Sequence, residues 1–198
     1  MKCHLKRLVI PKAWSIKKGG IVFTTRPNPG PHVFKLGIPL NIVLRDILGF
    51  ARNTKEAKRA LYSNEVLVDG IRRKEPKFIV GIMDVINIGK EFFRVVLNKG
   101  KISIISIDKK EGAVKPCKII GKNKVKDKIQ LNLYDGKNIL LDKEGYKTGD
   151  TLLINLPNQE IKDHVKLEKG CLIYLIGGKH IGDVGRIEDI ILNKITYK

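Results

Sequence analysis

The feature that most limits how this chain can fold is its first 35 residues, which carry eight Lys or Arg and no Asp or Glu. Four of the eight prolines fall in the same stretch, so neither a helical nor an alternating pattern of apolar residues persists there. Bulky residues such as Trp14, Phe23 and Phe34 are nevertheless frequent, which is unusual for a solvated linker. We therefore predict that residues 1–38 form an extended basic arm, with little structure in the free protein, that becomes ordered against RNA phosphate.

The whole chain is basic as well, with 39 Lys plus Arg against 20 Asp plus Glu and a formal net charge of +19. Such an excess favours a polyanionic partner. No apolar run approaches the ~18 residues that a membrane span needs, and the amino-terminal residues lack the apolar core of a signal peptide. The three cysteines are far apart and suggest no disulfide framework. We therefore expect a soluble protein of a reducing compartment.

Residues 39–88 have the pattern of a small domain that begins with two helices. Apolar residues recur at intervals of three and four from Leu40 to Leu48, which is typical of one face of an amphipathic helix. Asn53 is followed three residues later by Glu56, the spacing of a capping box at the start of a second helix. Two short helices in succession are therefore predicted.

A β-hairpin is predicted to complete this domain. Asp69-Gly70 lies between apolar residues and is a strong signal for a two-residue hairpin turn. Three cations, at positions 72–74, follow the turn directly, and residues 83–88 are expected to form a closing strand. The tight turn explains Asp69 sufficiently, so we do not assign it a catalytic role.

Clustered cations on neighbouring elements of this domain make it a candidate RNA-binding surface. Like charges that lie together repel one another, and a phosphate backbone removes that repulsion while it releases counterions. Ordinary solvated charge is the alternative for each single residue. The candidate cations of the domain are Arg45, Arg52, Lys55, Lys58, Arg59, Arg72, Arg73 and Lys74.

From residue 89 the pattern changes to short apolar runs separated by turn residues. Six or so strands in succession predict a central β domain over residues 89–166, a compact barrel or sandwich that acts mainly as scaffold. The expected strands are 92–97, 102–107, 129–133, 138–141, 151–156 and 161–167.

Lys122, Lys124, Lys126 and Lys128 alternate along this β domain. On a single strand all four would lie on one face of the sheet. Such a face could contact RNA, or it could protect an exposed sheet edge against aggregation. The sequence leaves both interpretations open.

Residues 167–198 are expected to form a last β module. Residues 170–186 resemble the KOW motif, a strand, a glycine-bearing loop and a second strand. Its glycines allow the main chain to approach phosphate closely, and Lys179, His180 and Arg186 supply cations beside it. The small barrel that normally contains this motif needs more strands than follow here, so we expect an incomplete module, in which either the protein ends early or the usual tail is missing.

Chemistry other than binding has little support in the sequence. The four histidines do not approach the spacing of metal ligands, and no catalytic Ser, His and Asp order or paired carboxylates in a glycine context occur. The glycines near Lys179 do not have the spacing of a phosphate-binding P-loop. We expect no metal, no cofactor and no enzymatic activity.

Two parts of the sequence resemble known families. Residues 39–88 are similar to the small helix-plus-hairpin RNA-binding domain that several translation and RNA-modifying proteins share. The flanking arm contains His4-Leu5-Lys6-Arg7, Pro11-Lys12, Trp14 and the string Arg26-Pro27-Asn28-Pro29-Gly30-Pro31-His32. These residues resemble the arm of ribosomal protein four of the small subunit, of the archaeal and eukaryotic type, and the resemblance runs from residue 4 to about residue 190.

The resemblance implies an α+β, multi-module protein: an extended basic arm, the helix-helix-hairpin domain, a central β-barrel or sandwich and an incomplete KOW-type β-barrel. It also implies a non-catalytic constituent of the cytoplasmic ribosome, with small-subunit ribosomal RNA and neighbouring small-subunit proteins as partners. The glycine-rich KOW loop looks closer to archaeal members. In the arm, the candidate RNA-contacting residues are Lys6, Arg7, Lys12, Trp14, Arg26 and His32.

Two other functions remain open. A free RNA-binding regulator or ribosome assembly factor would need the same basic surfaces. An RNA-modifying enzyme, such as a pseudouridine synthase, can carry the same helical unit, but the sequence offers no catalytic domain beside it.

Overall fold

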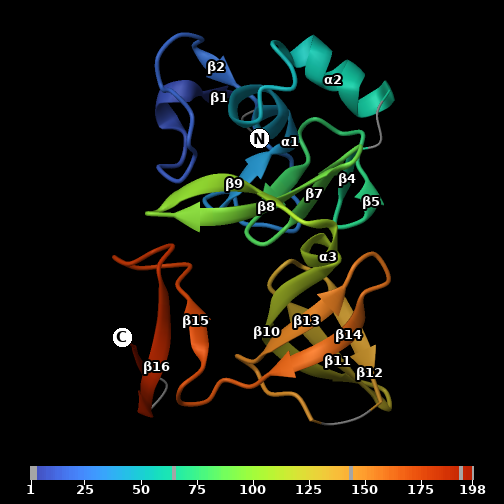
Figure 1. Cartoon of the computed structure of the whole chain (residues 1–198), viewed down its shortest axis with the longest axis vertical. Coiled ribbons are helices and arrows are strands. Elements are labelled where there is room, and N and C mark those ends of the chain that lie inside the picture. Colours follow the sequence, from blue (N-terminus) through green and yellow to red (C-terminus); the bar gives the residue numbers. More distant parts are fainter. Residues whose placement is uncertain (1–3, 64–65, 143–144, 192–193, 198) are drawn as a thin grey trace. The chain divides into compact units, whose positions relative to one another are not determined.

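A computed structural model describes residues 4–63, 66–142, 145–191 and 194–197 of the chain. The chain divides into two compact units (Figure 1). The first contains Met1–Val96 and Lys101–Ala113, and the second contains Leu97–Gly100 and Val114–Lys198. Strands dominate both units and the helices are few and short, so the protein is mostly β. None of the described helices is both long and apolar enough to cross a membrane.

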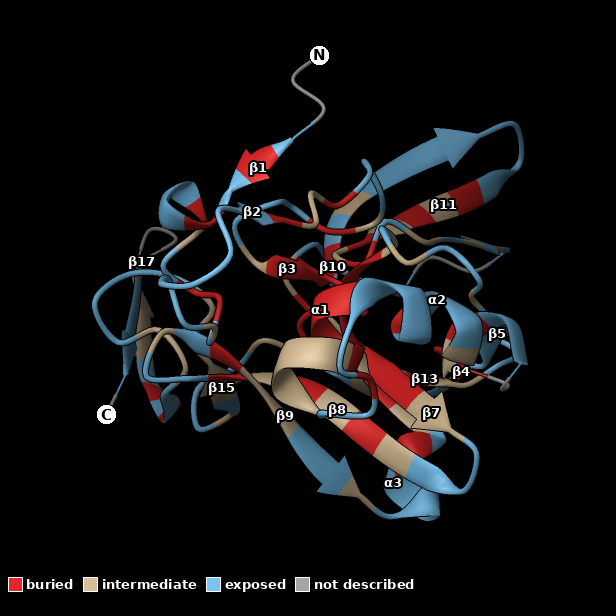
Figure 2. Cartoon of the chain, turned by 90° about the horizontal axis from the view of Figure 1, so that it is seen from above, coloured by how far each residue is buried: buried red, intermediate tan, exposed pale blue. Residues whose placement is uncertain are grey.

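An amphipathic helix begins the helix-and-hairpin part of the first unit, as predicted. It runs as α1 (Leu40–Ile42) and continues into a π-helical turn, η2 (Val43–Ile47). Leu40, Val43 and Leu44 of the apolar stripe are buried, whereas Ile47 and Leu48 are half-buried, and α1 lies among the buried elements in Figure 2. The Leu48 N–H donates to the Val43 carbonyl at 2.9 Å, which closes the last turn.

The second helix, α2 (Thr54–Ser63), begins at the expected capping box. The Glu56 N–H donates to Asn53 Oδ1 at 2.9 Å, and Glu56 Oε2 accepts the Arg52 N–H at 2.8 Å. The glutamate thus returns to the residue before the cap instead of to the Asn53 N–H. Either way, two donors at the start of the helix are satisfied.

The hairpin predicted at Asp69-Gly70 forms between β4 (Val66–Val68) and β5 (Ile71–Arg72). Both turn residues have positive φ, 52° for Asp69 and 76° for Gly70, as a two-residue turn of this kind requires. The Asp69 carboxylate accepts the Val85 N–H at 3.1 Å and so fastens the turn to the next strand.

The closing strand, β7 (Val85–Ile88), begins two residues later than predicted. Met83 has φ of 65° and lies in a turn, so the extended conformation of β7 starts only after this residue. The sheet then continues through β8 (Glu91–Asn98) and β9 (Lys101–Ile107), in the order β5-β4-β7-β8-β9. A short helix, α3 (Lys109–Gly112), follows.

The sheet continues past residue 88, where the sequence predicted a domain boundary. The first hairpin assigned to the central domain is hydrogen-bonded into the sheet of the helix-and-hairpin domain, because β7 and β8 pair from Val85↔Arg94 to Ile88↔Glu91. The first compact unit accordingly extends to Ala113, except for Leu97–Gly100, which belong to the second unit.

The arm is folded rather than extended. It contains β1 (Leu5–Lys6), which pairs with β2 (Phe23–Thr24), and a single 3-10 turn, η1 (Arg7–Val9), between them. The indole N–H of Trp14 donates to the Gly37 carbonyl at 2.8 Å, and the Ile102 N–H donates to the Ala13 carbonyl at 2.6 Å. The expectation of an extended arm fails because its apolar side chains find partners within the first unit.

The arm leads into β3 (Gly37–Pro39), which pairs with β6 (Ile79–Gly81). The Asn28 N–H also donates to the Lys77 carbonyl at 3.0 Å. The proline-rich string before β3 therefore lies along the segment that leads into β6.

The second unit contains a curved antiparallel sheet in the order β12-β11-β10-β13-β14. Its core includes Cys117, Leu131 and Leu152, and side chains from both edge strands, such as Ile139 and Ile161, pack against that core. The sheet therefore curls as a barrel does, although its edge strands β12 and β14 are not paired with each other within the described residues. The strands are β10 (Val114–Val125), β11 (Lys128–Leu133), β12 (Asn138–Leu141), β13 (Thr151–Asn155) and β14 (Glu160–Val165).

The four alternating lysines do not share one strand. Lys122 and Lys124 lie on β10, Lys126 has φ of 55° in the turn, and Lys128 begins β11. All four are exposed around the tip of this hairpin. A turn therefore interrupts the single face that alternation alone predicted.

The KOW-like segment forms a three-stranded sheet in the second unit. The strands are β15 (Leu172–Tyr174), β16 (Val184–Ile191) and β17 (Lys194–Tyr197), in that order. The glycine-bearing loop between β15 and β16 follows the strand–loop–strand pattern that the sequence predicted.

Candidate nucleic-acid interface

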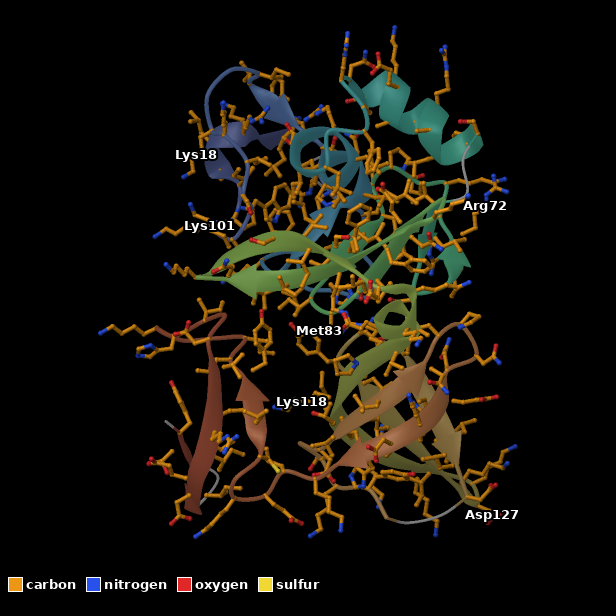
Figure 3. All side chains as sticks on the ribbon, in the orientation of Figure 1. Lys18, Arg72, Met83, Lys101, Lys118 and Asp127 are labelled. Carbon is orange, nitrogen blue, oxygen red and sulfur yellow. The ribbon has the colours of Figure 1, made fainter. Side chains whose placement is uncertain are left out.

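Helix α2 presents a row of cations on the face opposite its buried side. Ala57 and Leu61 are fully buried, whereas Lys55, Lys58 and Arg59 are exposed. The side chains that project from α2 away from the sheet are visible in Figure 3. The amphipathic pattern alone produces this division, since residues three and four apart lie on one side of a helix.

The β4–β5 hairpin brings further cations next to this helix. The guanidinium of Arg72 donates to the Tyr62 carbonyl, near the end of α2, at 3.2 Å. Lys74 follows β5 and is exposed. We call these exposed cations, from helix and hairpin together, the α2–β5 surface: Lys55, Lys58, Arg59, Arg72 and Lys74.

Arg73, between two members of this surface, has a different environment. Its guanidinium carbon lies 4.4 Å from the centre of the Phe78 ring, a cation–π contact. The side chain is half-buried. Arg73 therefore packs against the domain, while its neighbours reach solvent.

Arg45 and Arg7 are engaged by the same carboxylate. Arg45 pairs with Asp46 Oδ2 at 2.7 Å, and Arg7 pairs with Asp46 Oδ1 at 3.1 Å. Arg7 also donates to the Lys17 carbonyl at 2.5 Å, and its side chain is 8% exposed. Arg7 therefore fastens the arm to the first helix, while Arg45 pairs with its own neighbour on that helix, so both guanidinium groups have internal partners.

Trp14 and His32 are likewise inside the first unit. Trp14 is 3% exposed and contacts the Phe34 ring edge-on at 5.7 Å between centroids. His32 Nε2 lies 2.8 Å from Asp84 Oδ2, which also accepts the Gly81 N–H at 2.9 Å. The His32 ring occupies the space that a Cβ on Gly81 would need, so glycine is required there.

The other predicted residues of this unit remain at its surface. Lys6, Lys12 and Arg52 are exposed and Arg26 is half-buried. Arg52 has its backbone N–H bound by Glu56, but its side chain is free to extend from the start of α2.

In the second unit, Lys179 and His180 are exposed on the glycine-bearing loop between β15 and β16, whose sequence resembles the KOW motif, and Arg186 is exposed on β16. His180 Nδ1 lies 3.5 Å from Asp183 Oδ2. The loop is held against the turn at residues 97–100: the Gly100 N–H donates to the Ile181 carbonyl at 3.0 Å.

Tyr174 makes the second link between this loop and the turn. Its hydroxyl donates to the Leu97 carbonyl at 2.7 Å and accepts the Leu97 N–H at 2.6 Å. Burial raises the pKa of the Tyr174 hydroxyl above its ordinary value, against the opposing effect of the Leu97 hydrogen bond. Lys99, exposed in this turn, thereby joins the cations of the loop. The sequence analysis overlooked Lys99, because a hairpin turn gives no sign of what lies beside it.

A buried ion pair in the second unit was also missed. Lys115 Nζ lies 3.0 Å from Asp135 Oδ2, and their side chains are 1% and 3% exposed. Burial opposes ionisation of Asp135, but the charge and hydrogen bond of Lys115, with Lys137, outweigh it and hold the Asp135 pKa below its usual value. Lys115 is one of 39 basic residues, and its position on β10 carries no local signal that it faces inward.

Among the described residues, no three His, Cys, Asp or Glu side chains come together as a metal site would require. The geometry instead offers exposed cations on rigid elements. It defines a class of modular, mostly β protein in which a small helix-and-hairpin domain displays a basic surface.

Comparison with known proteins identifies the family within this class. The family models that match are described as RS4NT (NUC023) domain over residues 1–35, S4 domain over residues 38–86 and Ribosomal family S4e over residues 89–161. The chain belongs to the S4e family of ribosomal proteins, as the resemblance predicted.

Archaeal relatives cover nearly the whole chain. The protein from Methanosphaera stadtmanae named small ribosomal subunit protein eS4 is 50% identical over 98% of this chain and 80% of its own length. The protein of the same name from Methanocaldococcus jannaschii is 44% identical over 96% of this chain and 82% of its own length. The crystal structure of the 30S ribosomal protein S4e from Thermoplasma acidophilum superposes with a TM-score of 0.74 at 31% identity, covering 82% of this chain and 88% of that one.

Proposed function

We propose that this protein is a structural constituent of the small ribosomal subunit that binds ribosomal RNA without catalysing a reaction. Its membership of the S4e family supports the first part. The α2–β5 surface supports the second, because it concentrates five exposed cations on a helix and a hairpin joined by the Arg72–Tyr62 hydrogen bond. Such cations bind phosphate and release counterions, which provides affinity without reading sequence.

Specificity in this proposal comes from the shape of the RNA. The cations stand on a helix and a hairpin whose relative positions are determined by a packed core, so they match only phosphates with a corresponding spacing. The KOW loop, with Lys179, His180 and the adjoining Lys99, forms a second contact site of the same chemistry. Further phosphate contacts in this proposal come from the remaining predicted cations at the surface: Lys6, Lys12, Arg26, Arg52 and Arg186.

The setting of this function is the cytoplasmic ribosome, with neighbouring small-subunit proteins as further partners. The names of the archaeal relatives support this setting. The second candidate is a free RNA-binding regulator or assembly factor, since the same surfaces would serve it. Sedimentation distinguishes the two: we expect a stoichiometric amount of the protein in small subunits washed at high salt, and its loss in the wash would favour the second candidate.

Salt dependence tests the α2–β5 surface directly. For Lys55→Gln, Lys58→Gln and Arg72→Gln, measured one at a time on purified small-subunit ribosomal RNA, the slope of log K against log salt should fall by roughly 0.7–0.9 per substitution. Lys169→Gln is the matched control, because Lys169 is an exposed cation of the second unit that pairs with Asp189 at 2.8 Å and belongs to none of the proposed contacts. Unchanged slopes across the three variants would show that these charges are only solvated.

A further inference from the structure

The arm carries a largely exposed apolar patch, of which Phe23 also contacts the His4 ring edge-on at 5.4 Å between centroids. We define the arm patch as the large apolar side chains of residues 8–23 that remain more than half exposed, from 51% for Phe23 to 73% for Leu8. They come from two segments that lie side by side, since Lys6 pairs with Phe23 and the Arg7 N–H donates to the Val22 carbonyl at 2.9 Å. The members of the arm patch are Leu8, Val9, Ile21, Val22 and Phe23.

Loose packing does not explain this exposure. Between the same two segments, Ile10, Ala13 and Trp14 are 6%, 8% and 3% exposed. The arm thus divides its apolar residues into a buried set and an exposed set. Exposed apolar side chains that cluster within a polar rim mark interaction surfaces in soluble proteins.

RNA is a poor occupant for this patch. Protein contacts to RNA go mainly to phosphate and sugar oxygens and to bases stacked on aromatic rings. Four of the five members are aliphatic and can do neither, and only Phe23 is aromatic. Aliphatic side chains gain most from burial against other apolar side chains, by about 25 cal/mol for each Å² removed from water.

The charge around the patch determines what kind of protein fits. Lys6, Lys17 and Lys18 are exposed beside it, and residues 1–35 contain no acid. A second copy of this chain would bring the same cations into contact, and like charges across an interface are unfavourable. A partner with an apolar centre and Asp or Glu around it matches both the patch and its rim.

We propose that the arm patch is the docking site for a neighbouring small-subunit protein, through a segment with apolar residues at its centre and acidic residues at its edge. This inference rests on the proposed function for its setting. It assigns the exposed apolar face of the arm to protein and leaves the cations of the α2–β5 surface to RNA.

Photo-crosslinking in reconstituted small subunits tests the proposal. A photoreactive amino acid in place of Val22 should crosslink to another subunit protein, at a peptide with apolar residues and net negative charge. The same amino acid in place of Ile120, an apolar residue of β10 that is 59% exposed, controls for crosslinks that exposure alone produces. A Val22 crosslink to RNA, to a second copy or to nothing, or one to the same peptide as the control, would overturn the inference.

A charged variant separates this inference from the proposed function. For L8E combined with V22E, retention in high-salt-washed subunits should fall about tenfold, which corresponds to roughly 1.4 kcal/mol of lost docking. The variant L140E combined with V165E adds the same two negative charges elsewhere and is the control for net charge. At the same salt concentration, the affinities of the two double variants for purified ribosomal RNA should agree within about twofold. Both control positions are exposed residues of the second unit. Full retention, or a tenfold loss on purified RNA, would overturn the docking site, whereas the α2–β5 variants test RNA binding independently.

Discussion

The arm and the α2–β5 surface are both basic, yet they use their cations differently. In the arm, Arg7 is buried between the Lys17 carbonyl and Asp46. On α2, Lys58 projects into solvent from a helix whose other face holds the domain together. Net charge therefore does not measure how much positive charge is available to a partner, because burial and internal carboxylates remove part of it.

The largest expected effect tests whether the arm is part of the fold. Trp14→Ala should destabilise the first unit by about 3–5 kcal/mol, because it removes a buried aromatic ring and its hydrogen bond to Gly37. Chemical denaturation of the full chain measures the loss. Phe23→Ala removes an exposed ring of the same arm and should cost less than about 1 kcal/mol. Equal small losses would mean that the arm does not pack in solution.

A buried cation of the second unit extends the comparison. Lys115→Met removes the closer of the two cations that compensate the buried Asp135 carboxylate and leaves Lys137, at 3.5 Å and partly exposed, so it should destabilise this unit by about 3 kcal/mol. Combining it with Asp135→Leu should recover much of the loss, since no buried carboxylate then remains and Lys137 is partly exposed to water. The exposed pair of Lys128 and Asp142 provides the contrast, because Lys128→Met should cost about 1 kcal/mol or less.

Acid should weaken the same buried pair. The folded-state pKa of Asp135 is below its ordinary value of 3.8, so the unfolded state takes up a proton first as the pH falls. The stabilisation from this carboxylate is therefore complete above the ordinary pKa and is lost as the pH drops through the lower, folded-state pKa. Thermal unfolding across this acid range should show a steeper loss for the parent protein than for the Lys115→Met, Asp135→Leu double variant. Parallel losses would contradict the role of the pair.

A smaller effect should follow from loosening the arm. Asp46→Asn removes the charge that Arg7 and Arg45 share, which should cost about 1–3 kcal/mol. Hydrogen exchange in residues 5–24 should then become faster, while β10 stays protected. The parent protein should protect this stretch even without RNA; an unprotected arm in the parent would support the extended arm that the sequence predicted.

The smallest effect on stability should come from the α2–β5 surface, which we propose binds RNA. Lys58→Gln should change the free energy of unfolding by less than about 0.5 kcal/mol, because Lys58 is exposed and no core contact is removed. Denaturation checks this, and the salt slope of the same variant shows whether it still affects RNA binding. A loss above 1 kcal/mol would mean that Lys58 belongs to the packing of the domain.

Local sequence signals determined much of the fold. The Asn53 and Glu56 spacing marked the start of α2, and Asp69-Gly70 marked the hairpin turn, because each depends on residues no more than a few positions apart. The family was also recognisable from short motifs in the arm and in the helix-and-hairpin domain. The exposed cations of α2 followed from helical periodicity alone.

Only the tertiary structure decided which charged and aromatic residues face inward. Arg7 and Asp46 are 39 residues apart, His32 and Asp84 are 52 apart, and Lys115 and Asp135 are 20 apart. The sequence does not distinguish a buried arginine or lysine from an exposed one, because the partner of such a residue depends on how distant segments pack. Burying such a group is costly unless a carboxylate compensates it, so its place becomes defined only when the fold brings the two together.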